Sequence, residues 1–156
     1  MSQPYQEILS GECLLRHPPG FRHEQICNRL HQAVDDSLAD ISSTRLLPPR
    51  TVVQLVTGTL IRPDLALVTS ATGKVWLIAE VVDKMDHQPD TVIKKSLYED
   101  VRLPRLWMID PRYDNVEVYH GTPYGLSLKE ILAHRDELRE KLLPALALGL
   151  KDLFQE

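Results

Sequence analysis

Apolar and β-branched residues follow one another at strand-like spacing in five parts of the chain. Residues 75–82 are apolar on both alternating faces except at Glu80, which is typical of a central strand covered by helices on both sides. Residues 5–16 are expected to form a helical turn, a break at Gly11 and a short strand. Besides this short strand, five strands are predicted at residues 51–56, 60–68, 75–82, 105–109 and 115–119, the last at a sheet edge.

Apolar positions at helical spacing predict two amphipathic helices. The first covers residues 22–39 and the second covers residues 91–101. A third helix is expected near the carboxyl end, where Ser127 and Glu130 match a capping box, and Pro144 would end or bend it. Together with the strands, these helices predict an α/β domain with a mixed central sheet flanked by helices.

The composition is that of an ordinary globular domain. The chain has 156 residues, of which 43% are hydrophobic and 26% charged, and this is enough for one core. No apolar run approaches the roughly 20 residues that cross a bilayer, so no membrane partner is expected. The first residues lack the pattern of a secretory signal, and Cys13 and Cys27 lack metal-ligand or redox spacing. We therefore expect reduced thiols in a cytoplasmic protein.

The formal net charge of −4 restricts how the chain could contact nucleic acid. It argues against a protein that coats nucleic acid through a broad basic surface. It does not exclude an enzyme that binds nucleic acid locally, because a carboxylate-rich site stays negative until a cation neutralises it.

Asp64 and Glu80 are carboxylates inside otherwise apolar runs. A buried ionised carboxylate must recover its lost hydration from a cation, from hydrogen bonds or through a changed pKa. If the two runs pair as a hairpin, one register brings both side chains within reach of a single ion. Magnesium takes such oxygen ligands, together with waters and substrate phosphates. The structural alternative is that Asp64 caps a turn after Pro63 and that Glu80 is the buried partner of Arg62.

Lys94 is predicted to point toward the sheet. It shares one helix face with the apolar residues of its segment, including Tyr98, whereas Lys95 falls on the opposite side. An inward ammonium group near two carboxylates can orient a water and stabilise developing phosphate charge. Alternatively, its stem packs on apolar surface and its charge pairs with an acid. Lys84 is the second candidate for this role.

His23, Cys27 and His31 fall at i, i+4 and i+8 on one face of the first predicted helix. In principle they could bind zinc. Three ligands on one straight helix span too great a length for a tetrahedral site without help, so this pattern does not favour zinc. His23 is expected to lie at the helix start, near the site.

Several of these segments occur in an order that resembles a known family. The order and spacing are similar to those of the Uma-two-type putative restriction endonucleases, a branch of the PD-(D/E)xK nuclease superfamily, and the resemblance covers nearly the whole chain. The matching segments are Ser10-Gly11-Glu12, His23 with its helix, Arg62-Pro63-Asp64, Glu80-Val81-Val82, Lys94 through Tyr98, Leu106-Trp107-Met108-Ile109-Asp110-Pro111 and Val116-Glu117-Val118-Tyr119.

Two positions depart from the pattern of that superfamily. The superfamily usually carries its lysine two residues after the glutamate, where this chain has Val82. In this branch the lysine is relocated to the following helix, which agrees with the predicted face of Lys94. The Ser-Pro-Ser-like turn of the family is also missing, and residues 83–86 read Asp-Lys-Met-Asp instead.

The resemblance implies a single restriction-endonuclease-like domain over residues 1–156 and a hydrolase that cleaves phosphodiester bonds in DNA with Mg²⁺ or Mn²⁺. Asp64 and Glu80 would hold the ion, with the backbone carbonyl of Val81 as a further ligand. Lys94 would orient the attacking water. Glu12 would add an outer carboxylate, although a solvated turn residue explains it equally well. Because cleavage of duplex DNA often needs one active site per strand, we expect a homodimer.

Two other functions stay open at this point. One is a non-catalytic binding or regulatory protein that keeps the same fold. The other is hydrolysis of a nucleotide or another small phosphoester, which the acidic balance of the chain allows.

Overall fold

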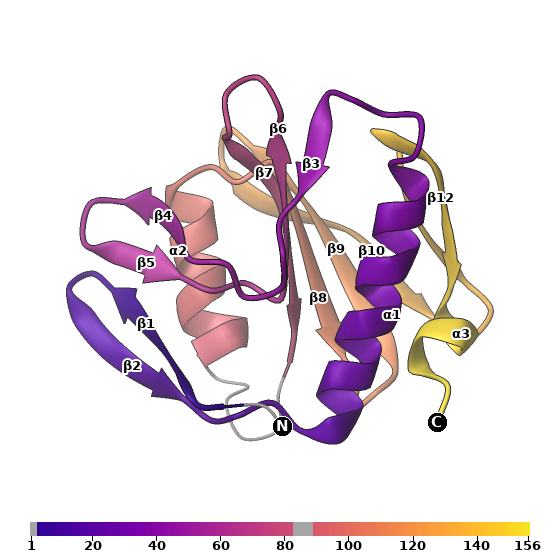
Figure 1. Cartoon of the computed structure of the whole chain (residues 1–156), viewed down its shortest axis with the longest axis horizontal. Helices are drawn as coiled ribbons and strands as arrows, with labels where there is room; N and C mark the ends of the chain where they lie inside the picture. Colours follow the sequence, from indigo (N-terminus) through magenta and orange to yellow (C-terminus); the bar gives the residue numbers. More distant parts are fainter. Residues whose placement is uncertain (1–2, 83–88) are drawn as a thin grey trace.

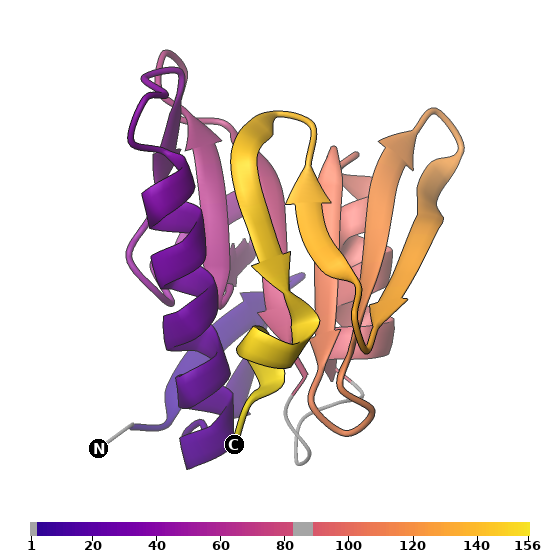
Figure 2. The ribbon, with the colours of Figure 1, turned by 90° about the vertical axis from the view of Figure 1, so that its right-hand side faces the viewer.

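The structure is a computed structural model that describes residues 3–82 and 89–156, and its elements form three layers (Figure 1). Helix α1 (Phe21–Ser37), the hairpin of β11 (Glu137–Glu140) and β12 (Leu143–Gly149), and helix α3 (Leu150–Phe154) cover one face of a central sheet, as Figure 2 shows. Helix α2 (Lys95–Asp100) and a smaller, four-stranded sheet formed by residues 5–16 and 53–61 cover the other face. The elements are β1 (Tyr5–Leu9), β2 (Glu12–Arg16), α1 (Phe21–Ser37), β3 (Thr44–Leu46), β4 (Val53–Val56), β5 (Thr59–Ile61), β6 (Leu65–Thr69), β7 (Val75–Val81), the π-helical segment η1 (Pro89–Lys94), α2 (Lys95–Asp100), β8 (Arg105–Asp110), β9 (Asn115–Thr122), β10 (Gly125–Ala133), β11 (Glu137–Glu140), β12 (Leu143–Gly149) and α3 (Leu150–Phe154).

The central sheet has the strand order β10-β9-β8-β7-β6-β3. Its pairings are antiparallel except between β7 and β8, which are parallel. Parallel neighbours need a crossover connection, and the helical segment of η1 and α2 lies on it. Strands β6 and β7 pair as an antiparallel hairpin, which was the condition for bringing Asp64 near Glu80, and Leu65 lies opposite Ala79. The mixed sheet expected from the sequence is confirmed.

Strand β7 separates two apolar cores. Leu77 and Ala79 pack in the core that includes Leu30 of α1, whereas Ile78 packs with Tyr98 in the core on the α2 side. The prediction of a central strand covered on both faces is therefore confirmed. Each fully buried leucine or isoleucine contributes roughly 1.5–3 kcal/mol relative to exposure, so this double coverage holds β7 firmly in place.

The amino-terminal segment is a hairpin, which corrects the helical turn predicted there. Strands β1 and β2 pair along their whole length, and the turn between them has positive φ at Ser10 (+50°) and Gly11 (+83°). Two positive φ values in a two-residue turn match the twist of the flanking strands. The strand period then turns Glu7 and Leu9 inward.

The single strand predicted over residues 60–68 is divided between two sheets. Strand β5 ends at Ile61 and pairs with β1 and β4, whereas β6 begins at Leu65 and pairs with β3 and β7. Pro63 explains the division, since it has no N–H group to donate and its φ is fixed. The break leaves Asp64 directly before β6, at the point where the chain enters the central sheet.

The helix predicted from Ser127 is wrong. Residues 125–133 form β10, which pairs with β9 through a register shift between Leu128 and Glu130. A capping box stabilises a helix by only about 1 kcal/mol, and here the long ladder with β9 prevails. As a consequence β9 lies between β8 and β10, so the edge position predicted for residues 115–119 is also wrong.

The carboxyl end forms the β11–β12 hairpin before any helix. Pro144 lies within β12 of this two-stranded ribbon, where a missing N–H group is tolerated. Only Leu150–Phe154 is helical, and Leu150, Leu153 and Phe154 dock on the α1 side of the core. Within the described residues, no helix has the length and apolar character of a membrane span.

Candidate metal centre

Asp64 lies where β6 begins, beside the end of β7. Because Leu65 pairs with Ala79, the antiparallel register places Asp64 next to Glu80 and Val81. The N–H group of Val81 donates to Oδ2 of Asp64 at 2.8 Å. The carboxylate is 3% exposed, so this hydrogen bond replaces part of the hydration that it has lost.

Glu80, Lys94 and Tyr98 meet on the α2 side of β7. Lys94 Nζ lies 3.1 Å from Glu80 Oε1, and the Tyr98 hydroxyl donates to the same oxygen at 2.6 Å. Glu80 is 2% exposed and Lys94 is 0% exposed, so the inward direction predicted for Lys94 is confirmed. Lys95 is half-buried with Nζ 4.6 Å from the centre of the Tyr119 ring. The second candidate, Lys84, lies outside the described residues, as do residues 83–86.

A third buried carboxylate, Glu7 of β1, joins this group. Lys94 Nζ lies 2.8 Å from Glu7 Oε2, which also accepts the backbone N–H of Arg62 at 2.7 Å. Arg16 pairs with the other oxygen, Oε1, at 2.5 Å. Glu7 thus connects the smaller sheet to Lys94 and holds the ammonium group between two carboxylates.

The structure does not bring Glu12 into the centre. It is exposed at the start of β2, and its register partner is Leu9. The amino-terminal carboxylate near Lys94 is Glu7, which is not among the predicted site residues because a helical turn is expected in its segment. Reading that segment as a strand would have revealed it, since Glu7 shares the inward face with Leu9.

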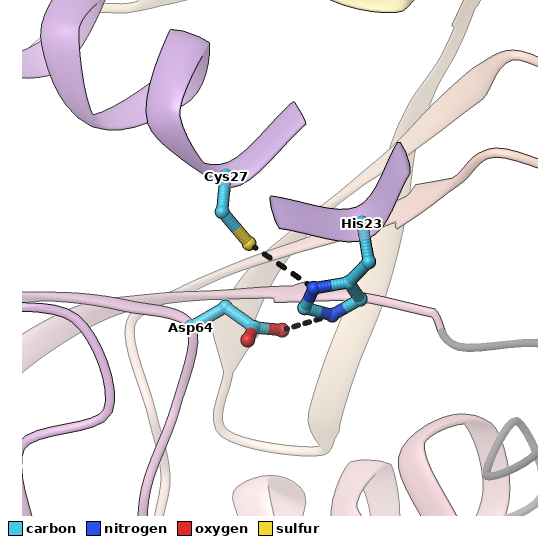
Figure 3. A group of neighbouring side chains, drawn as sticks. All are labelled: His23, Cys27 and Asp64. Carbon is cyan, nitrogen blue, oxygen red and sulfur yellow. Dashed lines mark hydrogen bonds and ion pairs between the residues drawn. The ribbon is translucent and has the colours of Figure 1, made fainter. Parts of the chain in front are cut away.

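His23 and Cys27 of α1 complete the surroundings of Asp64 (Figure 3). His23 Nε2 lies 3.0 Å from the carbonyl oxygen of Val81 and 3.4 Å from Asp64 Oδ2, and Cys27 Sγ lies 3.6 Å from His23 Nδ1. One donor atom of each of His23, Cys27 and Asp64 falls within 4.8 Å of the others. His31 is not in this set. Its Nε2 instead lies 2.6 Å from the backbone oxygen of Asp64, and it thereby fixes the main chain there.

The charges of the centre stabilise one another. Burial alone would raise the pKa of Asp64, but His23, the Val81 N–H and Lys94 outweigh it and hold that pKa below its usual 3.8. Burial together with the charge of Asp64 raises the pKa of the Cys27 thiol well above its usual value. At neutral pH, Asp64 is therefore a carboxylate and Cys27 a neutral thiol.

Arg50 lies beside Asp64, and Arg62 lies beside Arg50. Arg50 reaches Asp64 Oδ1 at 3.4 Å and Glu24 Oε1 at 2.8 Å, and its side chain is 21% exposed. The guanidinium of Arg62 donates to the backbone oxygen of Arg50 at 3.3 Å, rather than pairing with Glu80 as the structural alternative predicted. Arg50 is thus a partly exposed cation that contacts Asp64 directly.

The chemistry of these side chains fits a hard divalent cation. Carboxylate and carbonyl oxygens are the ligands that Mg²⁺ and Mn²⁺ prefer, and Asp64, Glu80 and the Val81 carbonyl supply them. The N–H group of Val81 contacts Asp64, and its carbonyl contacts His23, which itself contacts Asp64. Atoms of β7 and α1 therefore lie around the carboxylate of Asp64, which directly precedes β6.

Comparisons with known proteins agree with this fold. The family model "Uma2: Putative restriction endonuclease" matches residues 2–151. The crystal structure of a putative nuclease belonging to DUF820 from Anabaena variabilis superposes with a TM-score of 0.79 at 16% identity, over 97% of this chain and 90% of that one. No curated protein matches the chain. The mixed α/β fold predicted from the sequence is confirmed.

Proposed function

This chain belongs to the Uma2 putative restriction endonuclease family, as the resemblance predicted, and on that premise we propose that it is a metal-dependent endonuclease that hydrolyses phosphodiester bonds in DNA. The observation that carries the proposal is the pair of buried carboxylates at the end of β7, where Asp64 accepts the N–H of Val81 and the preceding residue, Glu80, pairs with Lys94. These residues come from three separate segments. Burying such charged groups costs free energy, and groups of this kind cluster at functional sites.

Asp64, Glu80 and the carbonyl of Val81 would hold the ion, Mg²⁺ or Mn²⁺. When bound, the ion would polarise the scissile phosphate and stabilise the charge of the leaving oxygen. Tyr98 keeps the Glu80 carboxylate in place through its 2.6 Å hydrogen bond, and the N–H group of Val81 does the same for Asp64. This fixed geometry lowers the reorganisation that cation binding would otherwise require.

Lys94 would orient the attacking water. Its ammonium lies between Glu7 and Glu80, at 2.8 Å and 3.1 Å, so it has a defined position despite its flexible stem. A cation held there favours a partly deprotonated water and can also contact the phosphate. Glu7 is a positioning residue in this scheme, because it acts through the lysine.

We propose DNA as the substrate on the basis of the family and of the few cations that lie near the centre. The net charge of −4 leaves phosphate contacts to a few residues, of which Arg50 is a partly exposed neighbour of Asp64. We further propose a homodimer, because one centre cuts one strand and duplex cleavage needs two. Nicking of one strand would need only a single chain.

A nicking assay on supercoiled plasmid tests this function. With Mg²⁺ or Mn²⁺, the wild-type protein should convert supercoiled to open-circular DNA, and Asp64→Asn and Lys94→Met should each lower the rate by at least about 100-fold. Lys95→Met is the matched control, because it removes the adjacent lysine charge outside the centre. Its rate should equal that of the wild type.

Equal rates in all four proteins would contradict the proposal and assign any cleavage to a contaminant. Metal binding without cleavage of DNA or of a nucleotide phosphoester would instead favour a binding protein on this fold. Cleavage of the nucleotide phosphoester alone, with no competition from DNA at low salt, would favour small-molecule hydrolysis.

A further inference from the structure

His23 lies where a ligand of the proposed ion would lie. Its Nε2 atom is 3.0 Å from the carbonyl oxygen of Val81 and 3.4 Å from Asp64 Oδ2. Neighbouring ligands of an octahedral ion with bonds of about 2.1 Å are about 3 Å apart. Both distances from the nitrogen to the oxygens are therefore close to those between neighbouring ligands of such an ion. Figure 3 shows the imidazole ring and the carboxylate pointing toward each other.

We infer that His23 is a nitrogen ligand of the metal and makes the centre selective for Mn²⁺ over Mg²⁺. This inference rests on the proposed function, because it concerns the same ion. An imidazole nitrogen is a ligand of transition-metal ions rather than of Mg²⁺, and Mn²⁺ is a transition-metal ion that also accepts carboxylate and carbonyl oxygens. A centre made of oxygens alone would give no such preference.

The surroundings of the ring support this role. Both oxygens near Nε2 are acceptors, so the proton occupies Nε2 when no ion is bound. On binding, the neutral imidazole carries its proton on Nδ1 instead, where Cys27 Sγ at 3.6 Å can accept it. Metal-bound histidines usually have such a partner on the second nitrogen, which fixes the orientation of the ring. Binding of the ion to Nε2 therefore displaces the proton that this atom carries in the free protein.

Helix α1 positions both partners of this contact. His23 lies in its first turn, and His31, two turns later, holds the backbone oxygen of Asp64 at 2.6 Å. The same helix therefore sets the imidazole and the carboxylate relative to each other. This also separates the two histidines by role, since the His31 ring nitrogen lies at the main chain and not at the carboxylate oxygens.

Pulsed electron paramagnetic resonance of bound Mn²⁺ tests the inference without any activity measurement. The wild-type protein should show coupling to a directly bonded nitrogen, and histidine labelled with ¹⁵N should change that coupling. His23→Gln should lose it and should bind Mn²⁺ at least about tenfold more weakly in calorimetry, while Mg²⁺ affinity changes less. His31→Gln is the matched control and should keep the nitrogen coupling.

The outcomes separate the inference from the function on which it rests. Mn²⁺ that binds the wild type without nitrogen coupling would overturn the role of His23 and leave an oxygen-only centre intact. Absence of Mn²⁺ binding at millimolar concentration would overturn both. Because the labelled wild-type protein gives the decisive spectrum, the result does not depend on whether His23→Gln folds.

Discussion

Glu80 and Glu140 are both buried carboxylates paired with a cation, yet their surroundings differ. Arg105 Nε donates to Glu140 at 2.7 Å, and the backbone N–H of Leu142, two residues away, donates to the other oxygen at 3.0 Å. That arrangement is complete within one ion pair and one turn. Glu80 instead shares Lys94 with Glu7 of a different sheet, beside the Val81 peptide that holds Asp64.

This contrast separates a structural ion pair from a candidate active site. One acid matched by one base is explained by stability alone. Glu7, Lys94 and Glu80 instead form a buried charged network that joins two sheets and continues to Arg16. A bound cation would offset the negative charge of the carboxylates in such a cluster. The predictions below test whether the two regions differ in function as they do in geometry.

The largest difference is expected between Glu80→Gln and Glu140→Gln. Loss of the Glu80 charge should weaken ion binding and lower the plasmid-nicking rate by at least about 100-fold, because a ligand is lost. Glu140→Gln should leave the rate unchanged and lower the free energy of unfolding by about 1 kcal/mol, measured by chemical denaturation. Similar nicking rates in the two variants would remove the distinction.

A smaller effect is expected from Glu7→Gln, with Glu12→Gln as its control. Glu7 positions Lys94 without binding the ion in our account, so its loss should slow nicking by about tenfold and leave the Mn²⁺ affinity nearly unchanged. Glu12 is exposed on β2, and its variant should match the wild type in both measurements. A Glu12→Gln rate below that of Glu7→Gln would restore the role that the family resemblance implied for Glu12.

Tyr98→Phe should have a modest effect. It removes the hydroxyl that donates to Glu80 at 2.6 Å and leaves the aromatic packing in place. We expect the free energy of unfolding to fall by about 1 kcal/mol and the nicking rate to fall only a few-fold. A loss of nicking as large as that of Glu80→Gln would mean that Tyr98 takes part in the reaction directly.

The smallest effect concerns pH. Because the pKa of Asp64 is lower in the folded state than its usual 3.8, the carboxylate contributes stability above that value and loses it as pH falls through the folded-state pKa. Between pH 5 and pH 3, the free energy of unfolding should therefore fall more steeply in the wild type than in Asp64→Asn. Parallel pH profiles, recorded without divalent metal, would contradict the lowered pKa.

Much of the centre was predictable because it lies in periodic segments. Glu80 interrupts an apolar strand, and the helical period distinguishes Lys94 from Lys95, so local patterns were sufficient there. The pairing of residues 60–68 with 75–82 also followed from two short apolar runs joined by a turn. The predicted strand over residues 60–68 is wrong in one respect, because a break at Pro63 divides it between two sheets.

The remaining features depend on contacts between distant segments. The approach of His23 to Asp64 is set by the packing of α1 on the central sheet, which no local pattern describes. The carboxyl-terminal strands were missed because the capping box at Ser127 is a local signal, whereas pairing with β9 is a tertiary one. Glu7 is not predicted for a third reason, because its segment is expected to be helical and is in fact a strand.

Anomalous diffraction from crystals soaked in Mn²⁺ tests the central claim most directly. The account predicts one strong peak beside Lys94, with oxygens of Asp64 and Glu80 and the Val81 carbonyl at about 2.0–2.3 Å from it. A peak bounded by other residues, or no peak at millimolar Mn²⁺, would contradict the proposed metal centre.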